Sequence, residues 1–140
     1  MNYIRPKRTF SPLSILLLCS LISNASAQLS ETDLELRAME FQTVVELGKK
    51  NFYDPGLGTR GSSCGDCHMD GSQTRTETYP KYKGQFEKVV TFAQMINWCI
   101  VGSLRGEALA LDSDKMVSLI TYLKHQRRDV ELAPGTYNDF

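Results

Sequence analysis

The sequence predicts a small all-α domain of about three to four helices, and three observations support this fold class. Three segments carry apolar residues at helical spacing, and residues typical of helix N-caps precede the first and the last of them. A C-x-x-C-H motif, Cys64-Gly65-Asp66-Cys67-His68, lies between the first two of these segments. Internal repeats and convincing β-hairpins are absent from the sequence.

The first helix is expected to begin after Ser30, where Asp33 completes a capping box. It continues to about Lys50, and the sequence 54–58, Asp-Pro-Gly-Leu-Gly, then predicts a turn. The residues expected to form its interrupted apolar face are Leu36, Met39, Val44 and Leu47.

Residues 69–86 are mostly polar and contain Pro80 and Gly84, so we expect an irregular loop there. A second helix is expected from about Glu87 to Val101, with Gly102 at its end. Its expected apolar face is made by Val90, Ala93, Ile96 and Ile100.

A last helix is expected from Asp114 to about Gln126, capped by Asp112 or Ser113. The stretch after Arg128 is expected to be a tail. The residues expected to point inward from this helix are Met116, Leu119, Ile120 and Leu123.

The C-x-x-C-H motif is the attachment signature of a c-type haem. Two intervening residues let one turn of chain bring Cys64 and Cys67 to the two porphyrin vinyl groups, and His68 then becomes the proximal iron ligand. The alternatives are half a zinc site, which needs a second ligand pair, and a redox dithiol, which needs a βαβ context. The sequence provides neither, so the expected cofactor is one covalent haem c, which would form a large part of the core.

Residues 1–27 predict a secretory signal peptide, leaving residues 28–140 as one domain. The segment begins with basic residues, its apolar run at 13–22 is too short to span a bilayer, and Ala25-Ser26-Ala27 is a cleavage site. We therefore expect a periplasmic protein without stable membrane insertion after cleavage. Lipidation at Cys19 is disfavoured because no small residue precedes it, and an uncleaved anchor is the other alternative.

The charge of the chain limits its partners. The whole sequence has 16 basic and 16 acidic residues. The expected signal peptide contains basic residues but no acidic ones, so its cleavage removes positive charge only. The remaining domain is therefore net negative, which argues against nucleic acid and anionic lipid as partners. A redox protein, such as another cytochrome or a subunit, remains as the expected partner.

Cys99 is the unpaired thiol once the haem has taken its two cysteines, and loose thiols are a liability in an oxidising compartment. Ligation of the haem iron would protect it, whereas burial as a small apolar residue and an intermolecular disulfide are the alternatives. Met95 lies one helical turn before Cys99 and is the alternative distal ligand. Met116 and His125 are weaker candidates for the iron, whereas Met69 is too close in sequence to His68 to reach the opposite face of the haem.

With this motif and this pattern of helices, the sequence resembles the monohaem c-type cytochrome family. Gly48 and Phe52 resemble the glycine and aromatic pair at which the first helix crosses the last, and Leu119 and Tyr122 resemble its contacts. A narrower resemblance is to the cytochrome c domain shared by the A subunit of the Sox thiosulfate-oxidising complex and thiosulfate dehydrogenase. The segments that carry it are 48–52, 54–58, 79–82, 96–99, 106–109 and 112–116.

This resemblance implies a cytochrome c-like domain over residues 28–140, with Cys99 as the distal iron ligand. It also implies an arginine one turn before that cysteine, where the relatives hold thiosulfate, but this chain has Met95 there. A thioether cannot pair with a dianion as a guanidinium does. Arg105 is the nearest cation in the sequence, although a surface charge is its more common role.

The sequence therefore predicts a periplasmic monohaem c-type cytochrome that acts in one-electron transfer, with His/Cys ligation and a link to sulfur oxidation. The alternative is a haem-containing subunit or enzyme of thiosulfate oxidation that uses Cys99. The missing arginine and the single C-x-x-C-H motif favour an electron carrier over an enzyme. A haem-based sensor or structural subunit would instead need an open iron position.

Overall fold

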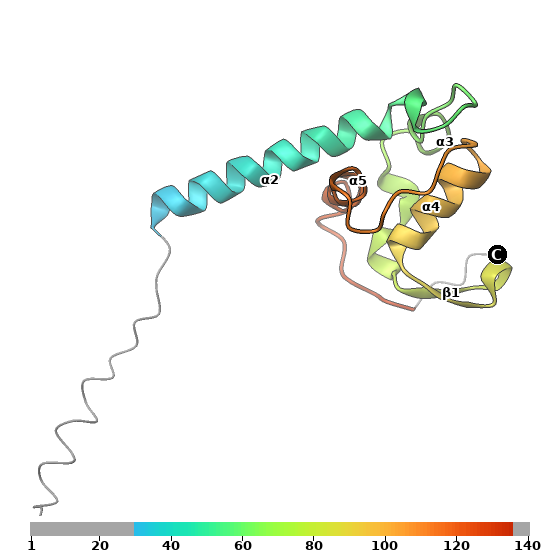
Figure 1. Cartoon of the computed structure of the whole chain (residues 1–140). Helices are drawn as coiled ribbons and strands as arrows, with labels where there is room; N and C mark the ends of the chain where they lie inside the picture. The colour runs from blue at the N-terminus through green and yellow to red at the C-terminus, as the bar shows by residue number, and fades with distance from the viewer. Residues whose placement is uncertain (1–29, 136–140) are drawn as a thin grey trace, which may run out of the picture.

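Three long helices, α2, α4 and α5, form the frame of the described residues, and the single-turn helix α3, a short hairpin and several turns connect them (Figure 1). The computed structural model describes residues 30–135, so the expected signal peptide lies outside the described residues. The helices are α2 (Glu31–Phe52), α3 (Gly65–His68), α4 (Phe92–Gly102) and α5 (Asp114–His125), and the strands are β1 (Lys81–Lys83) and β2 (Lys88–Val90). This largely helical content confirms the predicted all-α class. Over the described range, no helix combines the length and apolarity needed to cross a bilayer.

Helix α2 begins as predicted but does not bury the predicted face. Its capping box is present, because Asp33 N donates to Ser30 Oγ at 3.1 Å and Ser30 N donates to Asp33 Oδ2 at 3.2 Å. The first half of the helix projects away from the rest of the molecule (Figure 1). Leu36 and Met39 are accordingly 59% and 68% exposed, so their expected inward position is wrong. From its middle onward α2 reaches α5, first where the ring of Phe41 lies 6.3 Å from that of His125 and then through closer packing in its last turns.

Those last turns cross α5 at Gly48. A Cβ atom at this position would lie 1.9 Å from the carbonyl oxygen of Ser118. The same crossing holds a buried hydrogen bond, in which Asn51 Nδ2 donates to Ser118 Oγ at 2.9 Å. Phe52 packs against the ring of Tyr122, with centroids 5.3 Å apart. The predicted crossing of the first and last helices is therefore confirmed.

One apolar core joins α2, α4 and α5, and Leu57 and Leu104 add to it from the intervening loops. Met116 is completely buried in this core, which accounts for it as a packing residue. The other core residues are Val45, Phe52, Phe92, Ile96, Ile100, Leu119, Tyr122 and Leu123.

The region before α4 differs from the prediction. Strands β1 and β2 form an antiparallel hairpin with Lys81 opposite Val90, so the expectation of no hairpin is wrong. Helix α4 begins at Phe92 rather than near Glu87, whose backbone has a φ of 52°. Thr91 and Gln94 form a second capping box, which stops the helix from extending further back.

Candidate haem site

A cavity of about 300 Å³ lies between α3, α4, α5, β1 and the loop before β1. Its size is in the range of small-molecule and cofactor sites. The five residues that the sequence singled out all line it, and they come from two separate elements. These residues are Cys64, Cys67, His68, Met95 and Cys99.

The single turn α3 brings the C-x-x-C-H side chains together. The carbonyl oxygen of Cys64 accepts from His68 N at 3.0 Å and from Cys67 N at 3.3 Å, which closes the turn. Gly65 lies against the ring of Tyr53, where a Cβ atom would come within 2.4 Å of the ring carbons. A side chain at position 65 would therefore push this turn away from α2, which explains why glycine suits the second place of the motif.

Helix α4 presents Cys99 and Met95 to the cavity. Ile96 and Ile100 on the same helix are buried in the core and hold α4 against α5. The helix ends just after Cys99, whose carbonyl oxygen accepts from Ser103 N at 2.8 Å. Cys99 thus occupies the last turn of a helix whose rotation is set by core packing.

Asn97 ties the loop after α4 back to that helix. Its Nδ2 donates to the carbonyl oxygen of Leu109 at 2.8 Å, and Leu109 N donates to its Oδ1 at 2.9 Å. These two hydrogen bonds satisfy both backbone polar groups of Leu109, which lies in an irregular loop without a neighbouring strand. It connects two of the segments that carried the sequence resemblance, 96–99 and 106–109.

Burial in the cavity favours the neutral form of two thiols, those of Cys64 and Cys99. Burial raises the pKa of Cys64 to about 11, and the neighbouring Cys99 and Cys67 add to this rise. Burial also raises the pKa of Cys99, Cys67 raises it further, and the positive charge of Lys83 partly opposes both effects. The three sulfur atoms are therefore close enough to influence one another electrostatically.

Lys83 is a site residue that the sequence analysis missed. It lies on β1, is only 6% exposed and lines the cavity. Arg105, the cation singled out from the sequence, is exposed on the loop after α4 and does not line the cavity. Lysines are normally exposed, and Tyr82 beside it would have been expected inside. No signal in the sequence pointed to Lys83, because the chain before α4 was expected to be irregular.

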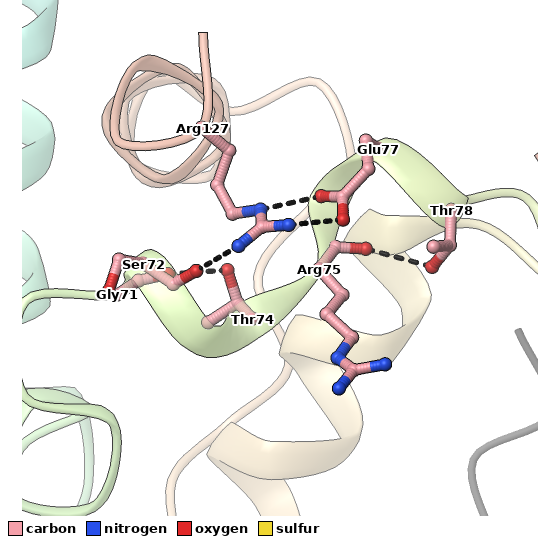
Figure 2. A network of polar contacts seen from close by, with 7 residues as sticks. All are labelled: Gly71, Ser72, Thr74, Arg75, Glu77, Thr78 and Arg127. Carbon is pink, nitrogen blue, oxygen red and sulfur yellow. Dashed lines mark hydrogen bonds and ion pairs between the residues drawn. The ribbon is translucent and has the colours of Figure 1, made fainter. Parts of the chain in front are cut away.

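Arg127 fixes the loop that forms one wall of the cavity (Figure 2). Its guanidinium donates to both carboxylate oxygens of Glu77, with Nε to Oε2 at 2.7 Å, and also to the carbonyl oxygen of Ser72. Figure 2 shows the side chain of Arg75 pointing away from this ion pair. Between Ser72 and Glu77 the loop contributes Gln73 and Thr74 to the cavity. The ion pair therefore anchors the cavity wall to the end of α5.

The same ion pair shifts the titration of Glu77. Burial alone would raise the pKa of this carboxyl group. The hydrogen bonds and charge of Arg127 outweigh burial and hold the pKa of Glu77 below its ordinary value. Glu77 is therefore ionised at neutral pH, which a bidentate arginine partner requires.

The residues at this cavity fit a covalent haem c. Two thiols and an imidazole come from one turn, a further sulfur comes from α4, and apolar side chains such as Phe52, Ile96 and Leu123 supply a dry lining. The weaker candidate ligands lie elsewhere. Met69 and Met116 do not line the cavity, and the ring of His125 lies 6.3 Å from that of Phe41 on α2.

Comparisons with known proteins identify a cytochrome c domain in this chain. Residues 48–132 match the family described as SoxA/TsdA, cytochrome c domain. The L-cysteine S-thiosulfotransferase subunit SoxA of Pseudaminobacter salicylatoxidans is 27% identical over 103 residues, which are 71% of this chain and 36% of that protein. The thiosulfate dehydrogenase of Psychrobacter arcticus is 30% identical over 76 residues, which are 49% of this chain and 23% of that protein.

The fold is also that of a solved relative. The crystal structure of SoxXA from P. pantotrophus matches with a TM-score of 0.62 at 18% identity, over 69% of this chain and 37% of that chain. The match thus spans little more than a third of the length of the solved chain and of the SoxA relative. The matched region contains the C-x-x-C-H motif, both candidate distal ligands and the α2–α5 crossing. The chain therefore belongs to the SoxA/TsdA cytochrome c domain family.

Proposed function

We propose that this protein is a periplasmic electron-transfer cytochrome with one covalent haem c, in which His68 and Cys99 bind the iron. The observation that carries the proposal is that the C-x-x-C-H side chains and Cys99 line one largely apolar cavity. Membership of a cytochrome c domain family supports haem c as the cofactor. The export signal predicted at residues 1–27 supports the periplasmic location.

Bound haem would supply one-electron chemistry, with its iron alternating between Fe(III) and Fe(II). Cys64 and Cys67 would hold the porphyrin through thioethers, so that the cofactor is retained in both redox states. His68 would be the proximal ligand. Cys99 would lose its proton on binding iron, as metal binding to a thiol requires. A thiolate donates strongly to Fe(III), so this ligand should give a lower potential than Met95 would.

The test uses the full chain expressed in a host that attaches haem c. We expect a coloured periplasmic protein whose intact mass equals the chain from Gln28 onward plus one haem. It should undergo reversible one-electron reduction. Replacing both Cys64 and Cys67 by serine should remove the covalent haem. A colourless product with the mass of bare polypeptide would overturn the proposal.

A second candidate function is a part in thiosulfate oxidation. The names of the relatives, L-cysteine S-thiosulfotransferase subunit SoxA and thiosulfate dehydrogenase, favour it. Met95 stands where the family resemblance calls for an arginine, which argues against direct thiosulfate binding at that place. Anaerobic addition of thiosulfate to the ferric protein distinguishes the two, because only a thiosulfate-oxidising centre would become reduced.

The SoxA relatives are named as subunits, which supports a protein partner for this chain. We propose a redox protein, such as another cytochrome or a subunit of a larger complex. Co-purification from the periplasm, followed by electron-transfer kinetics with the captured protein, would test this. A partner that cannot exchange electrons with the haem would contradict it.

A further inference from the structure

Strand β1 reverses the usual burial pattern, because its two lysines are buried and the tyrosine between them is exposed. Lys81 and Lys83 are 2% and 6% exposed, whereas Tyr82 between them is 53% exposed. Ordinary patterning would bury the tyrosine and expose both lysines. Burying an ammonium group is unfavourable unless it meets compensating charge or polar groups. Conflicts of this kind between local pattern and structure are expected at functional sites.

The two buried lysines have different surroundings. The Nζ atom of Lys81 lies 4.6 Å from the centroid of the Tyr79 ring, in a cation–π contact, and its side chain does not line the cavity. Lys83 lines the cavity together with Cys99 and Met95. Burial and Cys67 raise the pKa of the Cys99 thiol, and the charge of Lys83 partly opposes this rise. Lys83 is therefore the buried cation that faces the distal side of the candidate haem site.

We propose that Lys83 is a built-in positive charge beside the distal sulfur, and that it sets the reduction potential of the haem. The proposal rests on the electron-transfer function proposed above. Fe(III) carries one more positive charge than Fe(II), so a fixed ammonium nearby disfavours the oxidised state and raises the potential. Beside a Cys99 thiolate the ammonium also withdraws electron density from the sulfur, which weakens its donation to Fe(III) and acts in the same direction.

This role complements Cys99 as a ligand. Thiolate ligation alone lowers the potential, and the buried lysine beside the thiolate raises it again. The effect is strong because the cavity lining is mostly apolar, where charges are poorly screened. An exposed lysine would have little influence at the ionic strength of the periplasm.

The experiment measures the midpoint potential of the purified haem protein by spectroelectrochemistry in three variants. Lys83→Met should shift the Fe(III)/Fe(II) equilibrium at least tenfold toward Fe(III), which is about 59 mV downward for a one-electron couple. Lys83→Arg keeps the charge and should retain most of the wild-type potential. Lys81→Met is the matched control, because it removes a buried lysine from the same strand away from the cavity, and should leave the potential unchanged.

A Lys83→Met potential equal to that of wild type, or an equal shift in Lys81→Met, would overturn the proposal. Repeating Lys83→Met in a Cys99→Met background separates the effect through the thiolate from the direct effect on the iron charge. A smaller shift there supports the effect through the thiolate, whereas an undiminished shift would overturn the part of the proposal that places Lys83 beside the distal thiolate. Ferric spectra of the same samples report ligation separately. If the wild-type protein shows no thiolate signal, the His68/Cys99 ligation proposed above is overturned, whereas the effect of Lys83 on the potential is judged from the three variants alone.

Discussion

Gly48 of α2 rests directly on the backbone of α5, because a Cβ atom added to it would lie 1.9 Å from Ser118 O and 2.7 Å from Tyr122 Cβ. Neither obstacle is a flexible side-chain end. Leu119 and Leu123, which line the cavity, belong to the same helix α5. The spacing between the first and last helices therefore also fixes one wall of the candidate haem site.

Gly48→Ala is expected to destabilise the protein by about 3 kcal/mol, near the upper end for overpacking, because α2 and α5 must separate to admit the methyl group. Chemical denaturation of the haem-loaded protein would measure this. Gly102→Ala is the matched control, since no atom lies within 4 Å of the added Cβ at the end of α4. Equal stability of the two variants would contradict the close crossing.

Asn97→Ala should cost about 2 kcal/mol, because both backbone groups of Leu109 lose their partner in a part-buried position. The loop after α4 should become the first site of limited proteolysis. Gln42→Ala provides the control, since it removes an exposed amide that bonds only Glu46 on α2, and should change stability by less than about 0.5 kcal/mol. Unchanged stability and proteolysis in Asn97→Ala would show that the loop is held by other contacts.

The ion pair between Glu77 and Arg127 predicts a specific loss of stability in acid. The pKa of Glu77 is lowered in the folded state, so the unfolded state takes up its proton first as the pH falls. The stabilisation is present above the unfolded pKa and is lost as the pH drops through the folded pKa. Glu77→Gln should therefore flatten this part of the curve of unfolding free energy against pH.

Arg127→Met should reverse the direction in which the pKa of Glu77 shifts on folding, and with it the effect of Glu77 on stability in acid. Glu77 then stays buried without its partner, and burial raises its pKa. This variant should be least stable at neutral pH relative to wild type and should recover part of the difference on acidification. Parallel curves for wild type, Glu77→Gln and Arg127→Met would contradict the assigned role of the pair.

The sequence predicted helices well where capping and packing signals agreed. Ser30 with Asp33, and Ser113 before α5, mark helix starts that the structure confirms. The start of α4 was wrong because apolar Val90 extended the helical pattern backward into what is β2. The signal that would have corrected it was present, since Thr91-x-x-Gln94 is a capping box.

Other features depend on tertiary placement that no local pattern encodes. Leu36 and Met39 have helical spacing, but their part of α2 extends beyond the reach of α5. The burial of Lys83 reverses the usual preference of lysine, so composition argued against it. The candidate site was more predictable, because C-x-x-C-H is a covalent motif and Cys99 was the one thiol left over. The structure brings all of these residues to one cavity, and haem ligation itself stays a prediction.

The low-temperature EPR spectrum of the purified ferric protein tests the central claim most directly. The account predicts a low-spin signal of thiolate type in wild type and in Met95→Leu, and its loss in Cys99→Ala. A wild-type signal of His/Met type, or a Cys99→Ala spectrum identical to that of wild type, would contradict it.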